Sequence, residues 1–375
     1  MGAEKNGLLP LLSYRSVLDQ LSEGIIIADA SLRILYCNQE GARMAGLAQA
    51  ELLGSYCRDT LPVIDPLREG KAIWEDEPRL LTRALASGES GSYPHLLFLR
   101  ARSGSPLPVA VSLGPVHDAE GRIVGALCRL SDRSEEFRQR RLAGEIQKRM
   151  VTGGSLERGK LRVETLFKPV EELGGDFLEA FFLHDGTLVA TVADAVGHGV
   201  SASLFSMIYK ALLHAAFADA RKPQEVLERV NRGFCSTVSI EGFYLSAVLA
   251  CLDPEAATGC AASAGHPAGL LFRPNGKGHR LRQVFQARTP MLGMSEQACF
   301  PPTSLRLEPG EFLLLASDGL FEAEGADGRP YGVEGVERFF AASGGSLEQL
   351  YDDLLGCSRA VSLKDDLSAL RISCR

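Results

Sequence analysis

The sequence predicts an α+β protein with a smaller N-terminal domain, a helical linker and a larger C-terminal domain. The chain has 375 residues, which is more than a single hydrophobic core usually holds. Strand patterns dominate after residue 161 and are interrupted by separate helical patterns, which is typical of helices packed outside two sheets. A charged stretch without proline, 132–150, precedes this part. We place the domains at 14–132 and 156–375, with the helical linker at 133–152.

The N-terminal domain combines short strands and helices. Helical patterns cover Ser16–Leu21 and Gln39–Leu53. Strand patterns cover Gly24–Asp29, Arg33–Asn38, Tyr93–Ala101, Leu107–Leu113 and Ile123–Ser131. This order, with Ala28-Asp29, the Tyr36-Cys37-Asn38 segment before a helix and a closing hairpin at 118–132, resembles a PAS sensory domain. The resemblance implies a sensor, and the sequence does not identify its ligand.

The linker carries one narrow apolar seam. Phe137, Leu142, Ile146 and Met150 recur at near-helical spacing among charged residues. Such a seam suits packing on a partner or a short coiled coil, so we expect a homodimer through the N-terminal domain and the linker helix. A solvated helix without a partner is the competing interpretation.

The C-terminal domain is rich in strands. The strand patterns cover Leu161–Phe167, Phe177–Leu183, Thr187–Ala193, Tyr244–Leu252, Gly259–Ser263, Gly269–Phe272, Thr303–Leu307, Glu311–Ala316 and Leu367–Ser373. The helical patterns cover Val200–Ala218, Pro223–Phe234, Val333–Ala342 and Ser346–Leu355. Strands grouped in this way, with helices between the groups, predict two sheets covered by helices.

Four short acidic stretches carry the chemistry of this domain. They are Gly174–Phe177, Asp194–Gly199, Ser317–Gly319 and Lys364–Asp366. Asp194 and Asp318 follow apolar strands and stand close to glycines, which let the backbone turn sharply. Carboxylate oxygens are the ligands that Mg²⁺ and Mn²⁺ prefer. One Asp-Gly pair is usually only a turn, so the prediction of a metal site rests on the combination.

The order of these stretches and of the motifs between them is similar to that in SpoIIE-type phosphatases, bacterial members of the metal-dependent PPM serine/threonine phosphatases. The motifs are Gly174–Phe177, Asp194–Gly199, Ala264–Pro267, Pro290–Gly293, Ser317–Ala323 and Asp365–Ser368. The resemblance implies a PPM-type β-sandwich flanked by helices, two Mn²⁺ or Mg²⁺ ions, and removal of phosphate from phosphoserine or phosphothreonine on a partner protein. The usual partner is a STAS-domain anti-sigma-factor antagonist, which implies a role in sigma-factor regulation and the stress response.

The same resemblance implies a ligand set. Asp194 should bridge both metals, with the backbone carbonyl of Ala195 as a further ligand. Asp318 and Asp365 should hold the other ion, and Asp176 should bind through metal-held water. Two such ions acidify a bridging water and clamp the oxygens of an in-line displacement, so no covalent phosphoenzyme is required.

Three further residues near these motifs have open roles. Asp366 is the alternative to Asp365, because adjacent carboxylates cannot be ranked from sequence. His198 either donates a proton to the serine leaving group or orients its loop. His266 is expected to fix a turn near the site.

Two other functions compete with the phosphatase. A catalytically degenerate fold could act as a sensor-controlled protein-binding module, but a scaffold has no need of four separate ligand positions. The Gly174–Phe177 string also resembles that of diguanylate cyclases, and this alternative leaves the later acidic stretches unexplained.

Composition limits the partners and the compartment. The net charge of -7 gives no reason to expect nucleic acid. Nine cysteines without a Cys-x-x-Cys pair favour reduced thiols. The sequence shows no secretory signal, and its apolar stretches fall short of the roughly 20 residues that span a bilayer. We therefore expect a cytoplasmic protein without membrane insertion.

Overall fold

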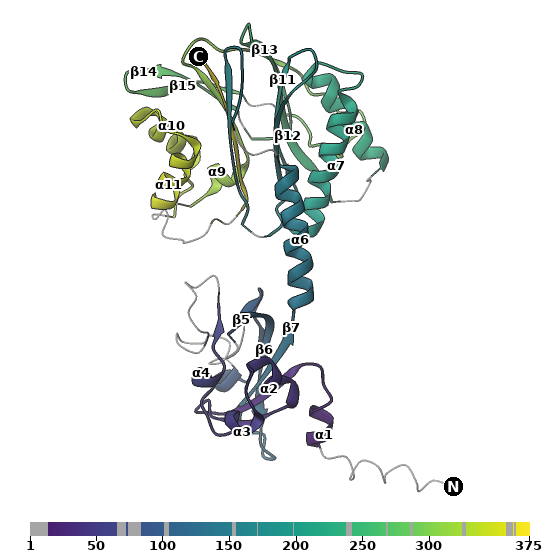
Figure 1. Ribbon diagram of the computed structural model, residues 1–375, viewed down its shortest axis with the longest axis vertical. Coiled ribbons are helices and arrows are strands. Elements are labelled where there is room, and N and C mark those ends of the chain that lie inside the picture. Colours follow the sequence, from purple (N-terminus) through teal and green to yellow (C-terminus); the bar gives the residue numbers. More distant parts are fainter. Residues whose placement is uncertain are drawn as a thin grey trace, which may run out of the picture. The chain divides into compact units, whose positions relative to one another are not determined.

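The chain divides into two compact units. In the computed structural model the first unit covers 1–139 and the second 140–375, and the division falls inside helix α6, Ser134–Met150 (Figure 1). The domain limits predicted from the sequence stay a prediction. The residues that the structure describes are 14–65, 73, 84–100, 105–151, 155–170, 172–197, 199–237, 242–267, 269–285, 288–324, 328–357, 363 and 365–375. Within these ranges no helix is long and apolar enough to cross a membrane.

The first unit is built on a seven-stranded antiparallel sheet. Its order is β2-β1-β7-β6-β5-β3, with β4 paired to β6. The strands are β1 (Gly24–Asp29), β2 (Ile34–Cys37), β3 (Val63–Ile64), β4 (Gly91–Ser92), β5 (Leu97–Leu99), β6 (Leu107–His117) and β7 (Ile123–Asp132). The helices are α1 (Tyr14–Leu18), α2 (Gln39–Ala45), α3 (Gln49–Leu52) and α4 (Cys57–Thr60).

The helices of this unit begin and end at recognisable residues. The Asn38 side chain accepts a hydrogen bond from the Gly41 N–H and so caps α2. Gly46 ends α2 with a φ of 68°, a left-handed conformation that glycine adopts without strain. The single helix predicted over 39–53 is therefore two helices. The PAS-like order of strands and helices is present.

The second unit is a sandwich of two antiparallel sheets. The five-stranded sheet has the order β10-β11-β12-β13-β16, and the six-stranded sheet has the order β15-β14-β17-β18-β9-β8. The strands are β8 (Leu156–Arg158), β9 (Leu161–Lys168), β10 (Asp176–Phe182), β11 (Leu188–Ala195), β12 (Leu245–Asp253), β13 (Thr258–Ala264), β14 (Gly269–Asn275), β15 (Gly278–Phe285), β16 (Thr303–Arg306), β17 (Phe312–Ala316) and β18 (Leu367–Cys374).

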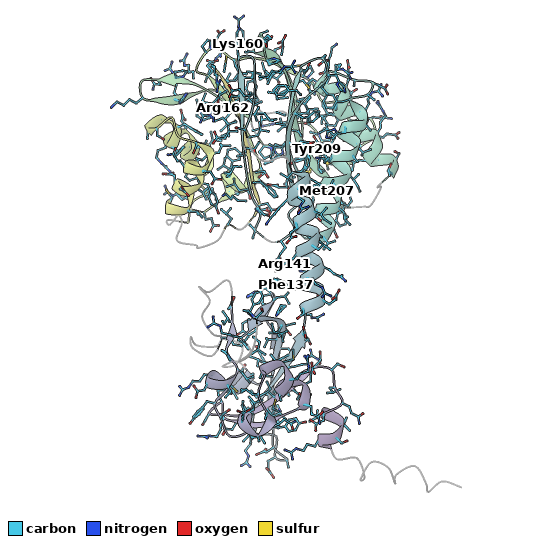
Figure 2. All side chains as sticks on the ribbon, viewed as in Figure 1. Phe137, Arg141, Lys160, Arg162, Met207 and Tyr209 are labelled. Atoms are coloured by element: carbon cyan, nitrogen blue, oxygen red, sulfur yellow. The ribbon has the colours of Figure 1, made fainter. Side chains whose placement is uncertain are left out.

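Helices cover both outer faces of this sandwich (Figure 1). They are α7 (Val200–Ala216) and α8 (Pro223–Thr237) on the five-stranded sheet, and α9 (Asp318–Glu322), α10 (Gly332–Ala342) and α11 (Leu347–Cys357) beside the six-stranded sheet. Tyr209 of α7, labelled in Figure 2, is fully buried, and its ring meets Phe177 edge to face at 5.8 Å. Its hydroxyl lies 2.6 Å from Thr191 Oγ1 on β11, which fixes α7 against the sheet.

The linker helix packs on the second unit with a face that the sequence did not predict. Gly144 and Gln147 are buried, whereas Leu142 and Ile146 of the predicted apolar seam are 59% and 52% exposed. A Cβ at Gly144 would collide with the backbone carbonyl of Glu172, so only glycine permits this approach.

Candidate metal centre

Two of the predicted ligands face each other across neighbouring strands. Asp176 is the first residue of β10, and its Cα partner in β11 is Asp194. Asp194 is in turn paired with Ser246 of β12. Directly opposite residues of antiparallel strands point to the same side of the sheet, so these three side chains form one row. This row crosses the five-stranded sheet where β10 and β12 begin and β11 ends.

The other predicted ligands come from the six-stranded sheet. Asp318 begins α9 directly after β17, and Asp365 lies just before β18, the strand that pairs with β17. The two chain segments are fastened together, because the Ser317 N–H donates to the Ser368 carbonyl at 2.9 Å. The Ser368 N–H donates back to Ser317 Oγ at 3.0 Å. A Cβ at Gly319 would collide with the Asp366 carbonyl, so glycine is needed where the segments meet.

The adjacent Asp365 and Asp366 occupy different environments. Asp366 is 7% exposed, and its two oxygens accept the N–H groups of Val170 and Gly175, each at 2.8 Å. Asp365 is exposed, and one of its oxygens accepts the Asp366 N–H at 2.8 Å. Asp366 thus braces two loops through both of its oxygens, whereas one oxygen of Asp365 accepts a single N–H from its neighbour.

The double glycine before Asp176 is required by close packing. A Cβ at Gly174 would collide with the Asp366 carboxylate. A Cβ at Gly175 would lie 2.9 Å from the carbonyl oxygen of Ala195, the predicted backbone ligand. These glycines let the start of β10 approach both acidic loops.

Burial and mutual repulsion raise the pKa values of the carboxylates on the five-stranded sheet. Asp176 is 2% exposed, and burial followed by the charge of Asp194 raises its pKa well above the ordinary value. The neighbouring Ser317 and Ser368 offset part of this increase. One carboxylate oxygen of Asp176, Oδ2, is buried without a hydrogen-bond partner among the described residues.

The same causes act on the remaining carboxylates. The pKa of Asp194 is raised to about 7, first by burial and then by the charges of Asp318 and Asp365. The pKa of Asp318 is raised by burial and by the charges of Asp365 and Glu322. The pKa of Asp194, on the five-stranded sheet, thus responds to the charges of carboxylates from the six-stranded sheet.

The donor set fits a hard divalent cation. It consists of carboxylate oxygens, one of them buried and unpaired, and a bound cation would relieve their repulsion. In the described ranges no three His, Cys, Asp or Glu side chains already converge closely enough to hold an ion. The ligand assignment therefore rests on strand register and electrostatics and stays a prediction. His198 lies outside the described residues.

Sequence reasoning identified His266 only as a residue that fixes a turn. Its Nδ1 lies 2.8 Å from Ser246 Oγ, and its Nε2 lies 3.1 Å from the Ala316 carbonyl oxygen. It therefore contacts both sheets next to the acidic residues. The motif Ala264–Pro267 was the available signal, but the partners, which lie 20 and 50 residues away, were not predictable from it.

A buried polar cluster between β10 and α7 was also missed. The Glu179 side chain, 6% exposed, accepts from Lys210 Nζ at 2.8 Å and lies 2.9 Å from His214 Nε2. Lys210 Nζ also donates to the Met150 carbonyl at the end of α6. The cluster connects β10, α7 and the linker helix.

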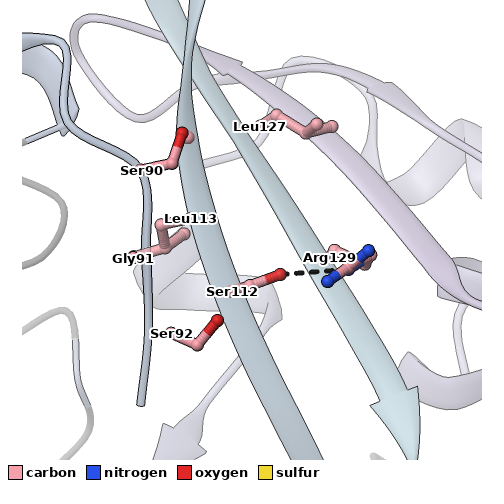
Figure 3. A pocket seen from close by; sticks show the side chains of 8 residues that line it. Ser90, Gly91, Ser92, Ser112, Leu113, Leu127 and Arg129 are labelled. Carbon is pink, nitrogen blue, oxygen red and sulfur yellow. Dashed lines mark hydrogen bonds between the residues drawn. The ribbon is translucent and has the colours of Figure 1, made fainter.

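The first unit has a hollow of a different kind. It measures about 350 Å³ and is open, and Ser112 and Arg129 lie in it, joined by a hydrogen bond of 3.0 Å (Figure 3). The rest of its lining consists of serine, glycine and leucine residues, without a carboxylate or histidine. It therefore offers no carboxylate or imidazole that could hold a divalent cation.

Comparison with known families gives the C-terminal part an assignment. Residues 184–375 match the family described as Stage II sporulation protein E (SpoIIE). The chain belongs to the SpoIIE family. Residues 12–133 match the PAS fold, so the SpoIIE domain follows an N-terminal PAS domain, as the sequence motifs predicted. The resemblance inferred from the acidic stretches is thereby confirmed.

Two curated relatives are similar to this chain at 25% and 23% identity. The phosphoserine phosphatase RsbP of Bacillus subtilis is 25% identical over 188 residues, which are 49% of this chain and 45% of RsbP. The phosphoserine phosphatase RsbU of the same organism is 23% identical over 218 residues, 57% of this chain and 64% of RsbU. The chain thus spans about half to two thirds of the length of these relatives.

A solved structure supports the fold of the SpoIIE domain. The PP2C domain of SiaA from Pseudomonas aeruginosa superposes with a TM-score of 0.54 at 20% identity. The match covers 65% of this chain and 98% of the SiaA domain. The expected phosphatase-type β-sandwich flanked by helices is therefore confirmed as a fold.

Proposed function

We propose that this protein is a metal-dependent serine/threonine phosphatase regulated by its PAS domain. The observation that carries the proposal is the pairing of Asp176 with Asp194 in neighbouring strands, together with the effect of the Asp318 and Asp365 charges on Asp194, in a SpoIIE-family domain. The naming of RsbP and RsbU as phosphoserine phosphatases supports it. The substrate is a phosphoserine or phosphothreonine on a STAS-domain anti-sigma-factor antagonist, which places the protein in sigma-factor regulation.

The residues have unequal roles in this proposal. Two Mn²⁺ or Mg²⁺ ions would supply an acidified water and charge stabilisation for in-line displacement at phosphorus. Asp194 and the Ala195 carbonyl would hold the shared side of the centre. Asp318 and Asp365 would hold the other ion, and Asp176 would reach the metal through water. Asp366 acts as a brace, because both its oxygens accept backbone N–H groups.

Phosphate release from a small aryl phosphate and from phosphorylated STAS proteins tests the activity. We expect Mn²⁺-dependent release by the wild type and a loss of at least ~100-fold in Asp194→Asn, because a shared ligand is removed. Asp352→Asn, an exposed carboxylate on α11, is the matched control and should behave as wild type. If no phosphate is released from either substrate with any divalent metal, and Asp194→Asn does not differ from the wild type, the non-catalytic binding module would be favoured.

The contacts of α6 support regulation through the linker. Gln147 Nε2 donates to the Gly174 carbonyl at 2.7 Å, and the Gly174 N–H donates back to Gln147 Oε1 at 3.1 Å. The Met150 carbonyl at the end of α6 also accepts a hydrogen bond from Lys210 Nζ of α7. A shift of α6 would therefore move the loop that carries Asp176 and the helix after the Asp194 loop.

A substitution at this contact tests the regulation. Gln147→Ala in the full chain should lower turnover about tenfold and weaken metal activation, because the Gly174 loop loses two buried hydrogen bonds. Gln139→Ala, an exposed glutamine on the same helix, is the control. Equal turnover and equal metal activation in all three proteins would contradict the coupling.

The exposed seam of α6 supports a homodimer. Leu142 and Ile146 lie four residues apart on one helical face and are more than half exposed. A second copy of the chain would cover both. Sedimentation should show a dimer for the wild type and a monomer for the double variant Leu142→Glu with Ile146→Glu. The same oligomeric state in both proteins would argue for a linker helix that is exposed to solvent.

A further inference from the structure

His266 joins the two sheets of the SpoIIE domain at the level of the acidic residues. Its side chain is buried, with the residue 4% exposed. The Ala316 carbonyl can only accept a hydrogen bond, so Nε2, 3.1 Å away, carries the hydrogen. In the neutral ring Nδ1 then accepts from the Ser246 hydroxyl at 2.8 Å. Both hydrogen bonds are buried.

The two partners of His266 adjoin different halves of the candidate centre. Ser246 on β12 is the Cα partner of Asp194 on β11. Ala316 is the last residue of β17, two positions before Asp318. The imidazole therefore spans from the strand beside Asp194 to the strand that delivers Asp318.

The backbone around His266 holds the ring in place independently of the carboxylates. The His266 N–H donates to Ser263 Oγ at 3.2 Å, and the Gly265 N–H donates to Thr289 Oγ1 at 3.0 Å. Gly265 has a φ of 65°, and a Cβ there would lie 2.7 Å from Met291 Cγ. A ring that is fixed by its own loop can define the position of the groups it contacts.

The protonation state agrees with this arrangement. Burial lowers the pKa of His266 to about 4, with the Ala316 carbonyl opposing the change in part. The ring is neutral near pH 7, so one nitrogen donates and the other accepts. Neither nitrogen is left to ligate a metal or to transfer a proton.

We propose that His266 is a positioning residue that sets the spacing between the Asp176 and Asp194 half of the metal centre and the Asp318 and Asp365 half. It acts by joining Ser246 to the Ala316 carbonyl, and it contacts neither substrate nor metal. The inference rests on the proposed metal-dependent activity for its functional consequence, whereas the hydrogen bonds themselves are independent of any metal.

Two substitutions separate the two hydrogen bonds. His266→Gln can extend its amide N–H to about the position of Nε2 and so retain the bond to Ala316. His266→Asn has an oxygen near the position of Nδ1 but no donor that reaches Ala316. We expect Mn²⁺ affinity, measured by calorimetry, to fall roughly tenfold or more in His266→Asn, as for a buried acceptor left unpaired. It should fall less in His266→Gln, where Ser246 loses its acceptor but the Ala316 carbonyl keeps its donor. Turnover at saturating Mn²⁺ should fall much less than affinity does.

A destabilising change outside the site serves as the control for a purely structural effect. Leu252→Ala, at the far end of β12, removes a fully buried side chain and should lower the melting temperature while leaving Mn²⁺ affinity unchanged. Wild-type affinity in both His266 variants, or equal losses in both that follow the melting temperature as in Leu252→Ala, would overturn the proposal.

A metal-free readout distinguishes this inference from the proposed activity. In chelated wild-type protein near pH 7, the ¹⁵N spectrum of the His266 ring should show the neutral Nε2–H tautomer. A protonated ring or the Nδ1–H tautomer would overturn the proposal whatever the activity assays show. If that tautomer is present but no Mn²⁺ binds to wild type, the proposed metal activity fails and the spacing role fails with it.

Discussion

Removing divalent cations should make the stability of this protein fall as pH rises, and Asp194 should account for much of the fall. Its folded-state pKa is raised from the ordinary 3.8 to about 7, first by burial and then by the charges of Asp318 and Asp365. A raised folded pKa means that the folded state binds the proton more tightly than the unfolded state does. The stabilisation is therefore complete below the unfolded pKa and is lost as pH rises through the folded pKa.

The magnitude follows from the two pKa values. Between about pH 5.5 and about pH 7.5 the contribution of Asp194 to the free energy of unfolding falls by ~2 kcal/mol. In this range the carboxyl is already ionised in the unfolded state and ionises in the folded state only near pH 7, and each pKa unit corresponds to about 1.4 kcal/mol. For a unit of roughly 200 residues this is a decrease of ~4–8 °C in melting temperature. Mn²⁺ should reverse most of the decrease, because a bound cation favours the ionised carboxylates.

The assay is thermal unfolding, across this pH range, of protein from which a chelator has removed divalent cations. Asp194→Asn should flatten the pH dependence, and Asp352→Asn, a surface carboxylate, should retain it. An identical pH slope in wild type and Asp194→Asn, or a stability that rises with pH only in the wild type, would refute the assignment of Asp194 to a crowded buried cluster.

Three further substitutions have defined outcomes. Asp366→Asn should lower the free energy of unfolding by ~1–3 kcal/mol, because one backbone N–H would face an amide N–H₂, and unchanged urea midpoints would contradict the bracing role. Lys210→Met should lower the free energy of unfolding by ~2–4 kcal/mol, since Glu179 stays buried without its lysine. The double substitution Glu179→Gln with Lys210→Met should recover part of this loss. Strictly additive losses in the double-mutant cycle would argue against an interaction between the two side chains. Tyr209→Phe should cost ~1 kcal/mol in chemical denaturation through the lost bond to Thr191, with turnover nearly unchanged, and a large loss of turnover would assign Tyr209 a role beyond packing.

Most strands of the sandwich were predictable from the sequence because their central residues form continuous apolar runs. Thr187–Ala193 and Tyr244–Leu252 correspond to β11 and β12, whose residues are almost all buried. The strand β15 was missed, because Gly278–Phe285 is an exposed edge strand whose polar residues resemble a loop. Edge strands bury little surface and so leave a weak pattern.

The candidate site was also predictable only in part. The positions of Asp194 and Asp318 at strand ends were readable from local sequence, since an apolar run and a glycine mark them. The different roles of Asp365 and Asp366 were not readable, because they depend on N–H groups more than 190 residues away. The same limit applied to Gln147, whose partner Gly174 is brought near only by the packing of α6.

We propose that the acidic stretches form one metal centre that hydrolyses phosphoserine or phosphothreonine. The most direct measurement is the number of Mn²⁺ ions bound per chain, determined by equilibrium calorimetry on the same preparations that are assayed for phosphate release from phosphorylated STAS proteins. We predict about two ions in the wild type, with binding and phosphate release lost together in Asp194→Asn. Phosphate release that persists in Asp194→Asn or in chelated wild type would contradict the claim.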